Sequence, residues 1–336
     1  MIIIISHNYL DEPTNDVIEW LTYFKADFER INGDDFIDSS KVNINIQNNL
    51  VTIGTRKIYI DKINVAWYRR WNSPNFVEPI FKTINDNKLN EHQGFFISRY
   101  SKYLDHESIS AYNFFFNVIN KDKWIPYYKL SRGFLEKSEV LLEAKKCGLQ
   151  IPETIVTNSR DELLKFIEKY KNVITKSIRD VDIVSYANYE LDVYTKTIDI
   201  KTIKSLSKNF IPTLFQRQII KEFEIRTFFI DDYFTSMAIF SQKDEKTRVD
   251  FRNYNLKKPN RFIPFNLPTN ILVKIRKLVK KLELRTGSID IIYSEIEKEY
   301  FFLEINPVGQ LGMISQNCNI PLEKIIAERL IQLDRK

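Results

Sequence analysis

The segment GSIDIIYSEIEKEYFFLEINPVGQ, residues 287–310, decides the fold of this chain. Two runs rich in β-branched and aromatic residues, Ile289–Tyr293 and Tyr300–Ile305, flank a short charged turn. Such runs on either side of a polar turn predict an antiparallel β-hairpin. Pro307 ends the second strand, because proline cannot donate a hydrogen bond to a neighbouring strand.

Three side chains that carry oxygen share one face of this predicted hairpin. If the strands pair about Glu297, Asp290 lies opposite Glu304, and Asn306 points to the same side two residues later. Apolar neighbours predict that both acids are buried, and buried carboxylates this close are costly unless a cation neutralises them. An all-oxygen set suits magnesium together with phosphate oxygens. The alternative is a hairpin whose polar residues are simply solvated.

Composition limits the class of protein. The chain has 336 residues, of which 43% are apolar, enough for about two domains at ~150 residues each. Lys and Arg total 50 against 44 for Asp and Glu, so the net charge is +6. This modest, dispersed surplus favours a nucleotide or an acidic peptide as ligand over nucleic acid.

The two cysteines, Cys147 and Cys318, predict free thiols in a reducing compartment. No apolar run approaches the ~18 residues that span a bilayer. The opening IIII lacks the basic region of a signal peptide. We therefore expect a cytoplasmic protein without a membrane partner.

The first part of the chain predicts a small α/β domain. A buried strand, Ile2–Ile5, precedes a helix over Asn15–Arg30 with apolar residues on one face. The run YRRW, Tyr68–Trp71, stands at the carboxyl end of a strand, where ligands collect in such sheets. A basic surface loop is an equally good interpretation. Further strands are expected near residues 42–46, 50–53, 57–60 and 65–68, and a long aromatic helix over Glu91–Asn120.

The remainder alternates helices and strands. Helices are expected over Phe134–Cys147, Asn158–Lys169, Thr269–Leu284 and Leu322–Leu333. Strands are expected over Glu153–Val156, Val173–Lys176, Leu214–Ile220, Glu224–Ile230 and Tyr233–Phe240, followed by a charged loop over Gln242–Pro264.

A nucleotide here needs a sheet and lysines, because the chain has neither a Walker A loop nor a GxGxxG motif. Lys137 and Lys176 could each reach a phosphate, although a lone lysine usually lies on the surface. Glu224 could accept hydrogen bonds from ribose hydroxyls, or could form a surface pair with Arg226. Arg252 follows three strands and could brace phosphoryl oxygens.

Taken in order, six elements resemble the ATP-grasp ligases. They are Lys137, Lys176, QRQIIKEFEIR (216–226), DFRNYN (250–255), IDIIY (289–293) and LEINPVGQ (303–310). Within that superfamily the chain is similar to the graspetide synthetases, which are microviridin-type peptide maturases. The forms YRRW, VDFRNY with a following PFNLP, and LEINPVGQ resemble most closely the maturases of grasp-with-spasm systems.

The resemblance implies an α/β (α+β) ATP-grasp fold in three parts. A small N-terminal α/β domain would cover residues 1–125, and a central ATP-grasp subdomain would cover residues 126–212. A C-terminal antiparallel-sheet subdomain with the metal site would cover residues 213–336. ATP would bind between the latter two.

The resemblance also implies individual roles. Arg226 and Arg252 would lie near the transferring phosphate, and Asp290, Glu304 and Asn306 would hold two Mg²⁺ ions. The residues implied to bind ATP are Lys137 and Lys176 at the phosphates and the adenine edge, Gln216, Lys221 and Glu224 at adenine and ribose, and Ile219 and Ile220 near adenine. A phosphate lid would lie near residues 179–189, although no glycine-rich loop is visible there.

The implied reaction closes rings in a ribosomally made precursor peptide. A side-chain carboxylate of the peptide attacks the γ-phosphate of ATP, and a Ser or Thr hydroxyl or a Lys amine then displaces phosphate. The products are ω-esters or ω-amides. The peptide would carry a leader and a core rich in acidic, Ser, Thr or Lys residues, and the family implies a homodimer.

Three alternatives stay open at this point. A small-molecule carboxylate–amine ligase of the same fold, adding glutamate or forming glutathione, would share every ATP and metal residue. A nucleotide-binding regulatory protein is disfavoured, because Asp290, Glu304 and Asn306 are all present. Nucleic-acid binding through Arg248–Arg261 is disfavoured, because the basic residues there are few.

Overall fold

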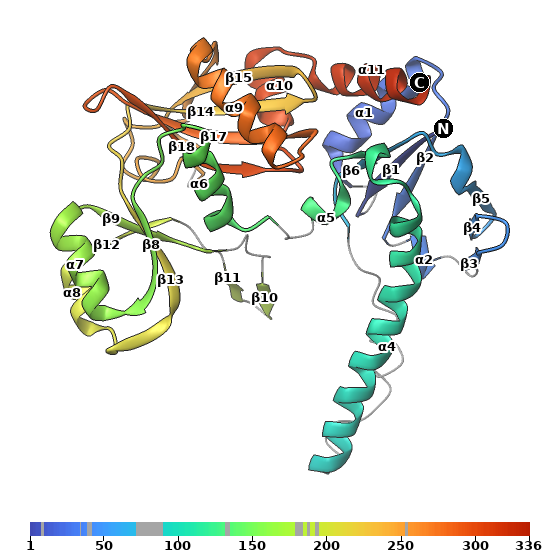
Figure 1. Ribbon diagram of the computed structural model, residues 1–336, viewed down its shortest axis with the longest axis horizontal. Coiled ribbons are helices and arrows are strands. Elements are labelled where there is room, and N and C mark those ends of the chain that lie inside the picture. The colour runs from blue at the N-terminus through green and yellow to red at the C-terminus, as the bar shows by residue number, and fades with distance from the viewer. Residues whose placement is uncertain are drawn as a thin grey trace. The chain divides into compact units, whose positions relative to one another are not determined.

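The computed structural model describes residues 1–7, 10–33, 35–38, 42–71, 90–131, 135–178, 184–186, 189–191, 195–252 and 255–336. The chain divides into two compact units (Figure 1). Unit 1 comprises Met1–Tyr128 and Pro321–Lys336, and unit 2 comprises Lys129–Ile320. The short helix α5 (Tyr128–Ser131) spans the division. The boundaries expected at residues 125 and 212, and with them a separate central subdomain, stay a proposal.

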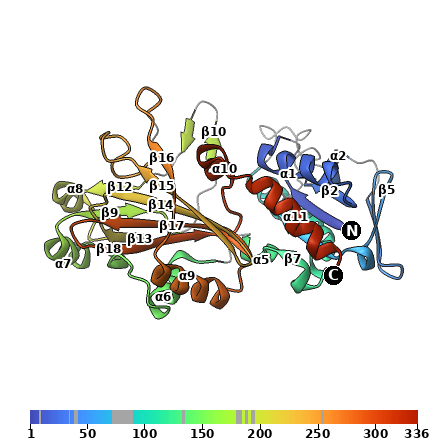
Figure 2. The same ribbon diagram turned by 90° about the horizontal axis from the view of Figure 1, so that it is seen from above.

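Unit 1 is built on a four-stranded parallel sheet in the order β2-β1-β6-β7. Its strands are β1 (Ile2–Ser6), β2 (Phe28–Asn32), β6 (Val65–Tyr68) and β7 (Trp124–Ile125). Strand β1 is buried along its whole length, as expected for an apolar strand inside a parallel sheet. Helices α1 (Glu12–Tyr23) and α11 (Leu322–Asp334) pack together beside it (Figure 2).

Smaller elements complete unit 1. The long helix α4 (Glu91–Val118) agrees with the predicted span. It begins with a capping box, in which Asn90 and Gln93 each accept a hydrogen bond from the other's backbone N–H. The remaining elements are the antiparallel sheet β3 (Val42–Asn45), β4 (Leu50–Ile53) and β5 (Arg56–Tyr59), and the short helices α2 (Asp35–Asp38), η1 (Ile60–Lys62) and η3 (Lys121–Lys123).

The helix predicted over Asn15–Arg30 is wrong at its carboxyl end. Helix α1 stops at Tyr23, and Lys25 has a φ of 54°, a left-handed conformation that no right-handed helix continues. Phe28 then starts β2, which pairs in parallel with β1. The helical spacing of Phe28 was misleading, because a short apolar run fits a strand equally well.

Unit 2 contains two antiparallel sheets. The first has the order β12-β9-β13-β8, and helices α7 (Arg160–Tyr170) and α8 (Ile200–Ser205) cover one of its faces with Leu163 and Ile203 in the shared core. The strands are β8 (Thr154–Ser159), β9 (Val173–Lys176), β12 (Lys196–Ile198) and β13 (Asn209–Arg217). A separate hairpin joins β10 (Val184–Tyr186) to β11 (Tyr189–Leu191).

The second sheet has the order β16-β15-β14-β17-β18. Helices α6 (Lys137–Lys146) and α9 (Thr269–Lys281) share its apolar core, in which Leu141 and Leu278 pack with Ile225 and Ile289. The strands are β14 (Phe223–Ile230), β15 (Tyr233–Phe240), β16 (Arg261–Phe265), β17 (Thr286–Ser294) and β18 (Glu299–Asn306).

Several elements of unit 2 escaped the sequence analysis, among them a strand and a helix. Strand β16 lies inside the predicted charged loop and pairs with β15 at the edge of the sheet. Its Pro264 argued against a strand, yet proline is tolerated on an edge. Helix α10 (Gly312–Cys318) is a second omission. Among the described residues, no helix is long and apolar enough to cross a membrane. Cys147 and Cys318 are free, as predicted.

The hairpin that organises unit 2 has the predicted register where it matters. Asp290 pairs with Glu304, whereas Ile291, the next residue, pairs with Phe302. Leu303 is therefore an extra residue in β18, which is a β-bulge. Without this bulge Asp290 would face Leu303, and the side chain of Glu304 would point to the opposite face of the sheet.

Gly287 permits the close approach of β17 and β18. A Cβ atom at this position would lie 2.7 Å from the backbone oxygen of Asn306 and 3.1 Å from the ring of Phe229. Real Cβ atoms do not approach backbone oxygen so closely, so any other residue would push the strands apart. The constraint is spatial, because the φ of Gly287 is not positive.

We predict that Gly287→Ala lowers the free energy of unfolding by about 2 kcal/mol, because the added methyl group overpacks this contact. Gly94→Ala is the matched control, since a Cβ atom at Gly94 in α4 meets nothing within 4 Å. Urea unfolding followed by circular dichroism measures both variants. Equal midpoints for the two would contradict the spatial argument.

Candidate functional site

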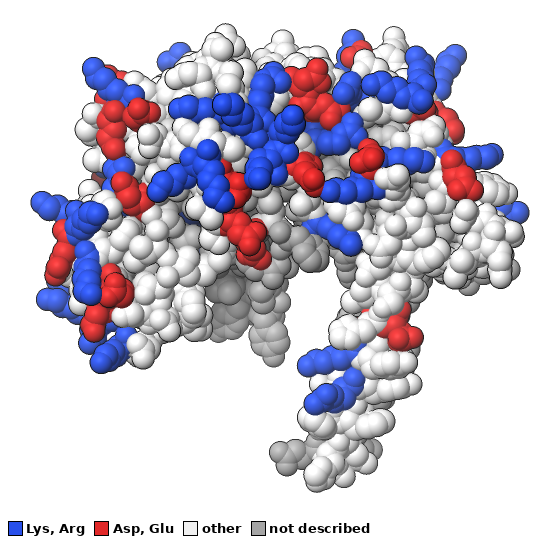
Figure 3. Space-filling model, in the orientation of Figure 1, with Lys and Arg blue, Asp and Glu red and all other residues white. Residues whose placement is uncertain are grey.

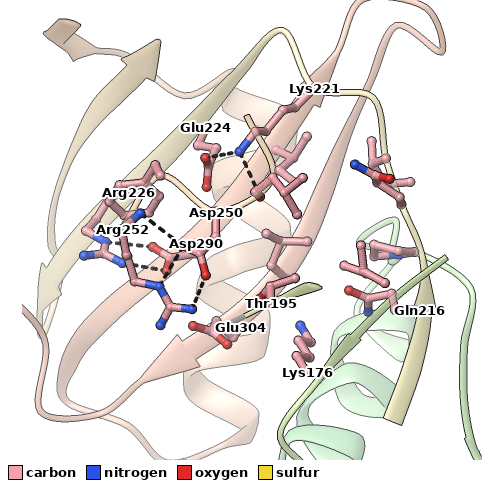
Figure 4. Close-up of a pocket in the computed structure, with 18 of the residues that line it drawn as sticks. Lys176, Thr195, Gln216, Lys221, Glu224, Arg226, Asp250, Arg252, Asp290 and Glu304 are labelled. Atoms are coloured by element: carbon pink, nitrogen blue, oxygen red, sulfur yellow. Dashed lines mark hydrogen bonds and ion pairs between the residues drawn. The ribbon is translucent and has the colours of Figure 1, made fainter. Parts of the chain in front are cut away.

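A cavity of about 360 Å³ lies between the two sheets of unit 2 (Figure 4). Strands β9 and β13 line it on one side, and β14, β17 and β18 line it on the other. Every residue predicted for the site lines this cavity except Ile220. The folded chain therefore brings together side chains that the sequence separates widely.

Arg226 and Asp290 form the central ion pair of the cavity. They lie directly opposite each other on β14 and β17. The guanidinium donates from Nε and Nη2 to the two carboxylate oxygens at 2.8 and 2.7 Å. Burial lowers the pKa of Arg226, but the charge and hydrogen bonds of Asp290, together with the charges of Glu304 and Glu224, outweigh this effect and the pKa is raised. Arg226 therefore stays charged and fixed in orientation.

A second buried pair joins Lys221 and Glu224. The Lys221 Nζ donates to the carboxylate of Glu224 and, at 3.2 Å, to the carbonyl of Val249. Burial raises the pKa of Glu224, although the Lys221 charge opposes this rise. Glu224 and Arg226 are both buried and each has its own partner, so the surface pair considered from the sequence is wrong.

Two lysines flank Glu304 from other elements. Lys137 begins α6, and its Nζ lies 3.7 Å from the Glu304 carboxylate. Lys176 ends β9. Burial lowers its pKa, and the opposing effect of the Glu304 charge is smaller, so the net shift is downward. Figure 4 shows Lys176 and Glu304 pointing into the same part of the cavity. This region concentrates positive charge beside two carboxylates.

The apolar end of the cavity is lined by Ile219, which packs with Ile292 and Phe301. Gln216 is buried, and its Nε2 donates to the hydroxyl of Thr154 at 2.8 Å. The side chain of Ile220 is 55% exposed and does not line the cavity. Any contact of this residue with a ligand would have to come from its backbone.

Arg252 lines the cavity from the segment that follows β15. Its guanidinium donates to both oxygens of Asp250 at 2.9 and 2.6 Å. Burial raises the pKa of Asp250, but Arg252 outweighs burial and the pKa is lowered. About half of the Arg252 side chain is exposed, so it can reach a ligand. Residues 253–254 of the DFRNYN segment lie outside the described residues.

The predicted magnesium ligands fit that ion in their chemistry. Asp290 and Glu304 face each other across the hairpin and both line the cavity with Asn306. The described residues contain no group of three or more His, Cys, Asp and Glu that could hold a metal. Two carboxylates and an amide oxygen nevertheless suit Mg²⁺, which usually takes one or two carboxylates and completes its shell with water and phosphate.

Several lining residues were not identified from the sequence. Gln310 accepts a hydrogen bond from Arg226 Nη1 at 2.5 Å, and its backbone N–H points to Ser288 Oγ at 3.4 Å. Thr195 also lines the cavity. Gln310 ends the LEINPVGQ motif, and a polar residue just after the turn at Gly309 was the available signal.

The YRRW segment lies in unit 1. Tyr68 and Arg69 are buried, whereas Arg70 is exposed. Burial lowers the pKa of Arg69 to about 10, and the nearby Asp11 opposes this effect. A basic surface loop therefore describes Arg70 but not Arg69. The carboxylate of Asp11 accepts hydrogen bonds from the hydroxyls of Ser6 and Thr14 at 2.8 and 2.6 Å.

The model of the RimK-like ATP-grasp domain family matches residues 135–330, which is more than half of the chain. The chain belongs to this family. It is therefore an ATP-grasp ligase, and the predicted fold class is confirmed. A search of curated proteins found no match.

Solved structures resemble this ATP-grasp ligase over its full length. Macrocyclase MdnC bound with precursor peptide MdnA, from Microcystis aeruginosa MRC, has a TM-score of 0.79 and 23% identity over 99% of each chain. A RiPP-associated ATP-grasp ligase from Chryseobacterium gregarium, in complex with ADP and a leader and core peptide, has a TM-score of 0.80 and 24% identity over 99% and 96%. ATP-grasp ligase PsnB, complexed with minimal precursor, Mg and ADP, has a TM-score of 0.74 and 15% identity over 99% and 97%.

The likeness to these structures shows the fold of the ATP-grasp ligase, including its N-terminal part. The phosphate lid expected near residues 179–189 falls largely outside the described residues.

We predict that Lys176→Met stabilises the ligand-free ligase by about 1 kcal/mol, because it removes a partly buried cation whose charge is disfavoured. Burial lowers the Lys176 pKa from 10.5 in the folded chain, so the unfolded chain holds the proton more tightly. The destabilisation of the folded chain by the Lys176 charge is present at neutral pH and fades as the pH rises toward 10.5.

Thermal unfolding at pH 7 and pH 10 measures the difference between Lys176→Met and the wild type. Lys201→Met, in the exposed part of α8, is the matched control. A lower melting temperature for Lys176→Met at pH 7 would show that the Lys176 charge stabilises the empty cavity.

Proposed function

We propose that this ligase is an ATP- and Mg²⁺-dependent peptide macrocyclase that forms ω-ester or ω-amide crosslinks in a ribosomal precursor peptide. The observation that carries the proposal is the cavity itself, in which Lys137, Lys176 and Arg226 converge beside Asp290 and Glu304. Full-length likeness to macrocyclases that were solved with peptides supports the choice of a peptide as substrate.

ATP would lie along the cavity with its base at the apolar end. Ile219 and Ile292 would supply the apolar walls that an adenine ring needs. Glu224 would accept a hydrogen bond from ribose, because a carboxylate has acceptor sites beyond those used by Lys221 and Ser241. Gln216 would stand beside the base, held by its bond to Thr154.

The phosphates would lie at the charged end. Lys137 and Lys176 would neutralise their oxygens as point charges. Asp290, Glu304 and Asn306 would hold Mg²⁺, which supplies charge neutralisation at the β- and γ-phosphates. Phosphate contact would also keep Lys176 protonated, against the effect of burial on its pKa.

The first step would transfer the γ-phosphoryl group to a side-chain carboxylate of the peptide. A carboxylate oxygen forms a bond to phosphorus while the bond from phosphorus to the bridging oxygen breaks, giving an acyl phosphate and ADP. Arg226 would brace the moving group, since Asp290 and Gln310 already fix its guanidinium. Arg252, whose side chain is partly exposed, would also contact this group. Such preorganised charges stabilise a transition state without reorganisation.

The second step would close the ring. A hydroxyl or amine of the same peptide attacks the acyl carbon, loses its proton and expels phosphate. Holding both groups of one peptide in the site makes this step effectively unimolecular. No covalent intermediate with the enzyme is required.

Intact-mass spectrometry of the precursor peptide after incubation with enzyme, ATP and Mg²⁺ tests the proposal. The expected result is an ATP-dependent loss of about 18 Da per ring, the mass of one water. Hydroxylamine then separates labile esters from amides. ADP formation only with a free amino acid, and no loss of mass from the peptide, would instead identify a small-molecule ligase.

We predict that Glu304→Gln lowers ATP turnover by about 100-fold or more, because it removes a charge from the metal site. The side chain of Glu304 is about one-third exposed, so we expect the variant to keep its fold. An ADP-release assay measures turnover, and circular dichroism checks the fold. Glu299→Gln, on the exposed start of β18, is the matched control and keeps full turnover. Normal ADP release by Glu304→Gln would refute the metal assignment.

A further inference from the structure

Helices α6 and α9 of unit 2 carry a basic outer face. Helix α9 contains five Lys or Arg residues and no acidic residue, and Figure 3 shows Lys and Arg side chains gathered over the part of unit 2 that contains it. Helix α6 ends with Lys145 and Lys146. The basic face is formed by the exposed or partly exposed lysines Lys145, Lys274, Lys277, Lys280 and Lys281.

The charges of the basic face are not neutralised within the protein. None of its lysines forms an ion pair in the part of the chain that the structure describes, whereas Lys146 pairs with Glu143 at 2.7 Å. Along α9, Lys277 lies three residues after Lys274 and three residues before Lys280. Like charges at this spacing destabilise a helix. An anionic partner bound to α9 would relieve this repulsion.

The lysines of the two helices belong to one surface. A Cβ atom at Gly148, which follows α6, would lie 3.6 Å from the Cε atom of Lys274 in α9. The hydrogen bond and charge of Lys146, together with the charge of Lys281 in α9, lower the pKa of Glu143 in α6. Side chains of α9 therefore lie near the end of α6, and the positive potentials of the two helices add.

One exposed apolar residue accompanies the lysines of each helix. Leu142 is 53% exposed and lies three residues before Lys145. Val273 is 46% exposed and lies four residues before Lys277. Residues three or four apart share a helical face, so this surface suits a polypeptide that carries carboxylates and apolar side chains. Nucleic acid fits less well, because neither helix contains an aromatic residue on which a base stacks.

Helix α6 connects the basic face to the cavity. Its first residue, Lys137, lines the cavity, and Lys146 is its last residue. At ~1.5 Å per residue, these two positions are about 14 Å apart along the helix axis. About four residues of extended peptide cover that distance. One peptide can therefore contact the basic face and the cavity at the same time.

We propose that the basic face is a docking site for an acidic segment of the substrate peptide, outside the residues that undergo ring closure. This proposal rests on the proposed function, which supplies the peptide. Carboxylates of the segment pair with the lysines, and its apolar side chains contact Leu142 and Val273. Docking keeps the reacting side chains of the same peptide at a high effective concentration beside the cavity.

Fluorescence anisotropy of a labelled oligoglutamate peptide tests docking without ATP. The wild type should bind this peptide, and more weakly as the salt concentration rises. Lys277→Glu/Lys280→Glu should raise the Kd by about tenfold or more. Lys201→Glu/Lys204→Glu is the matched control, because it makes the same change at exposed lysines with the same spacing in α8. Equal Kd values for the two double variants would overturn the docking site.

Ring formation in the precursor peptide tests the contribution of docking to catalysis. Lys277→Glu/Lys280→Glu should raise the KM for the peptide by about tenfold and leave kcat unchanged, because the basic face does not touch the reacting atoms. Lys277→Gln/Lys280→Gln should raise the KM by less, and circular dichroism checks that both variants fold. An unchanged KM, or a lower kcat at unchanged KM, would contradict docking on this face.

A failure of docking differs from a failure of the proposed function. If the wild type closes rings and every variant has the same KM, the docking site alone is overturned. If the wild type converts no peptide, the proposed function is refuted, and the oligoglutamate measurement still decides whether the basic face binds acidic peptide. Tighter binding of single-stranded RNA than of oligoglutamate, lost in Lys277→Glu/Lys280→Glu, would assign the face to nucleic acid and overturn the proposal.

Discussion

The ion pair between Arg226 and Asp290 is the constraint on which unit 2 depends. The two residues face each other across the neighbouring strands β14 and β17, and two hydrogen bonds from the Arg226 guanidinium to the Asp290 carboxylate join them. Removing either partner would leave an uncompensated charge in the interior, which costs roughly 3–5 kcal/mol. If β14 and β17 paired one residue out of register, one of the two charged side chains would point to the other face of the sheet, into the apolar core. The pair therefore fixes the register of the sheet as well as the cavity.

The rest of the cavity is arranged around this fixed pair. The bulge at Leu303 brings Glu304 beside Asp290. Gln310, which follows β18, accepts a hydrogen bond from Arg226. Lys137 lies at the start of helix α6, and Lys176 lies at the end of strand β9 in the other sheet. Three cations, Lys137, Lys176 and Arg226, thus lie close together beside Asp290 and Glu304. The negative charge of a polyphosphate would complement these three cations.

The sequence was most informative where local pattern and chemistry coincide. The hairpin could be predicted because period-two alternation fixes the face of Asp290 and Glu304 relative to each other. Most helices and strands also matched. Strand β2 was mistaken for helix because its pairing with β1 is a tertiary contact, and β16 was missed because an edge strand tolerates proline. Gln310 escaped because its role depends on Arg226, which lies far away in sequence.

The partly buried position of Lys176 has a further chemical consequence. A lysine whose pKa burial lowers carries a larger neutral fraction, and a neutral amine is a nucleophile. An acyl phosphate formed beside it would be open to attack by that amine, which would acylate the enzyme instead of closing a ring. Phosphate charge next to Lys176 would hold the proton in place and keep the amine unreactive. The nucleotide would thus act as a protecting group for the enzyme that consumes it.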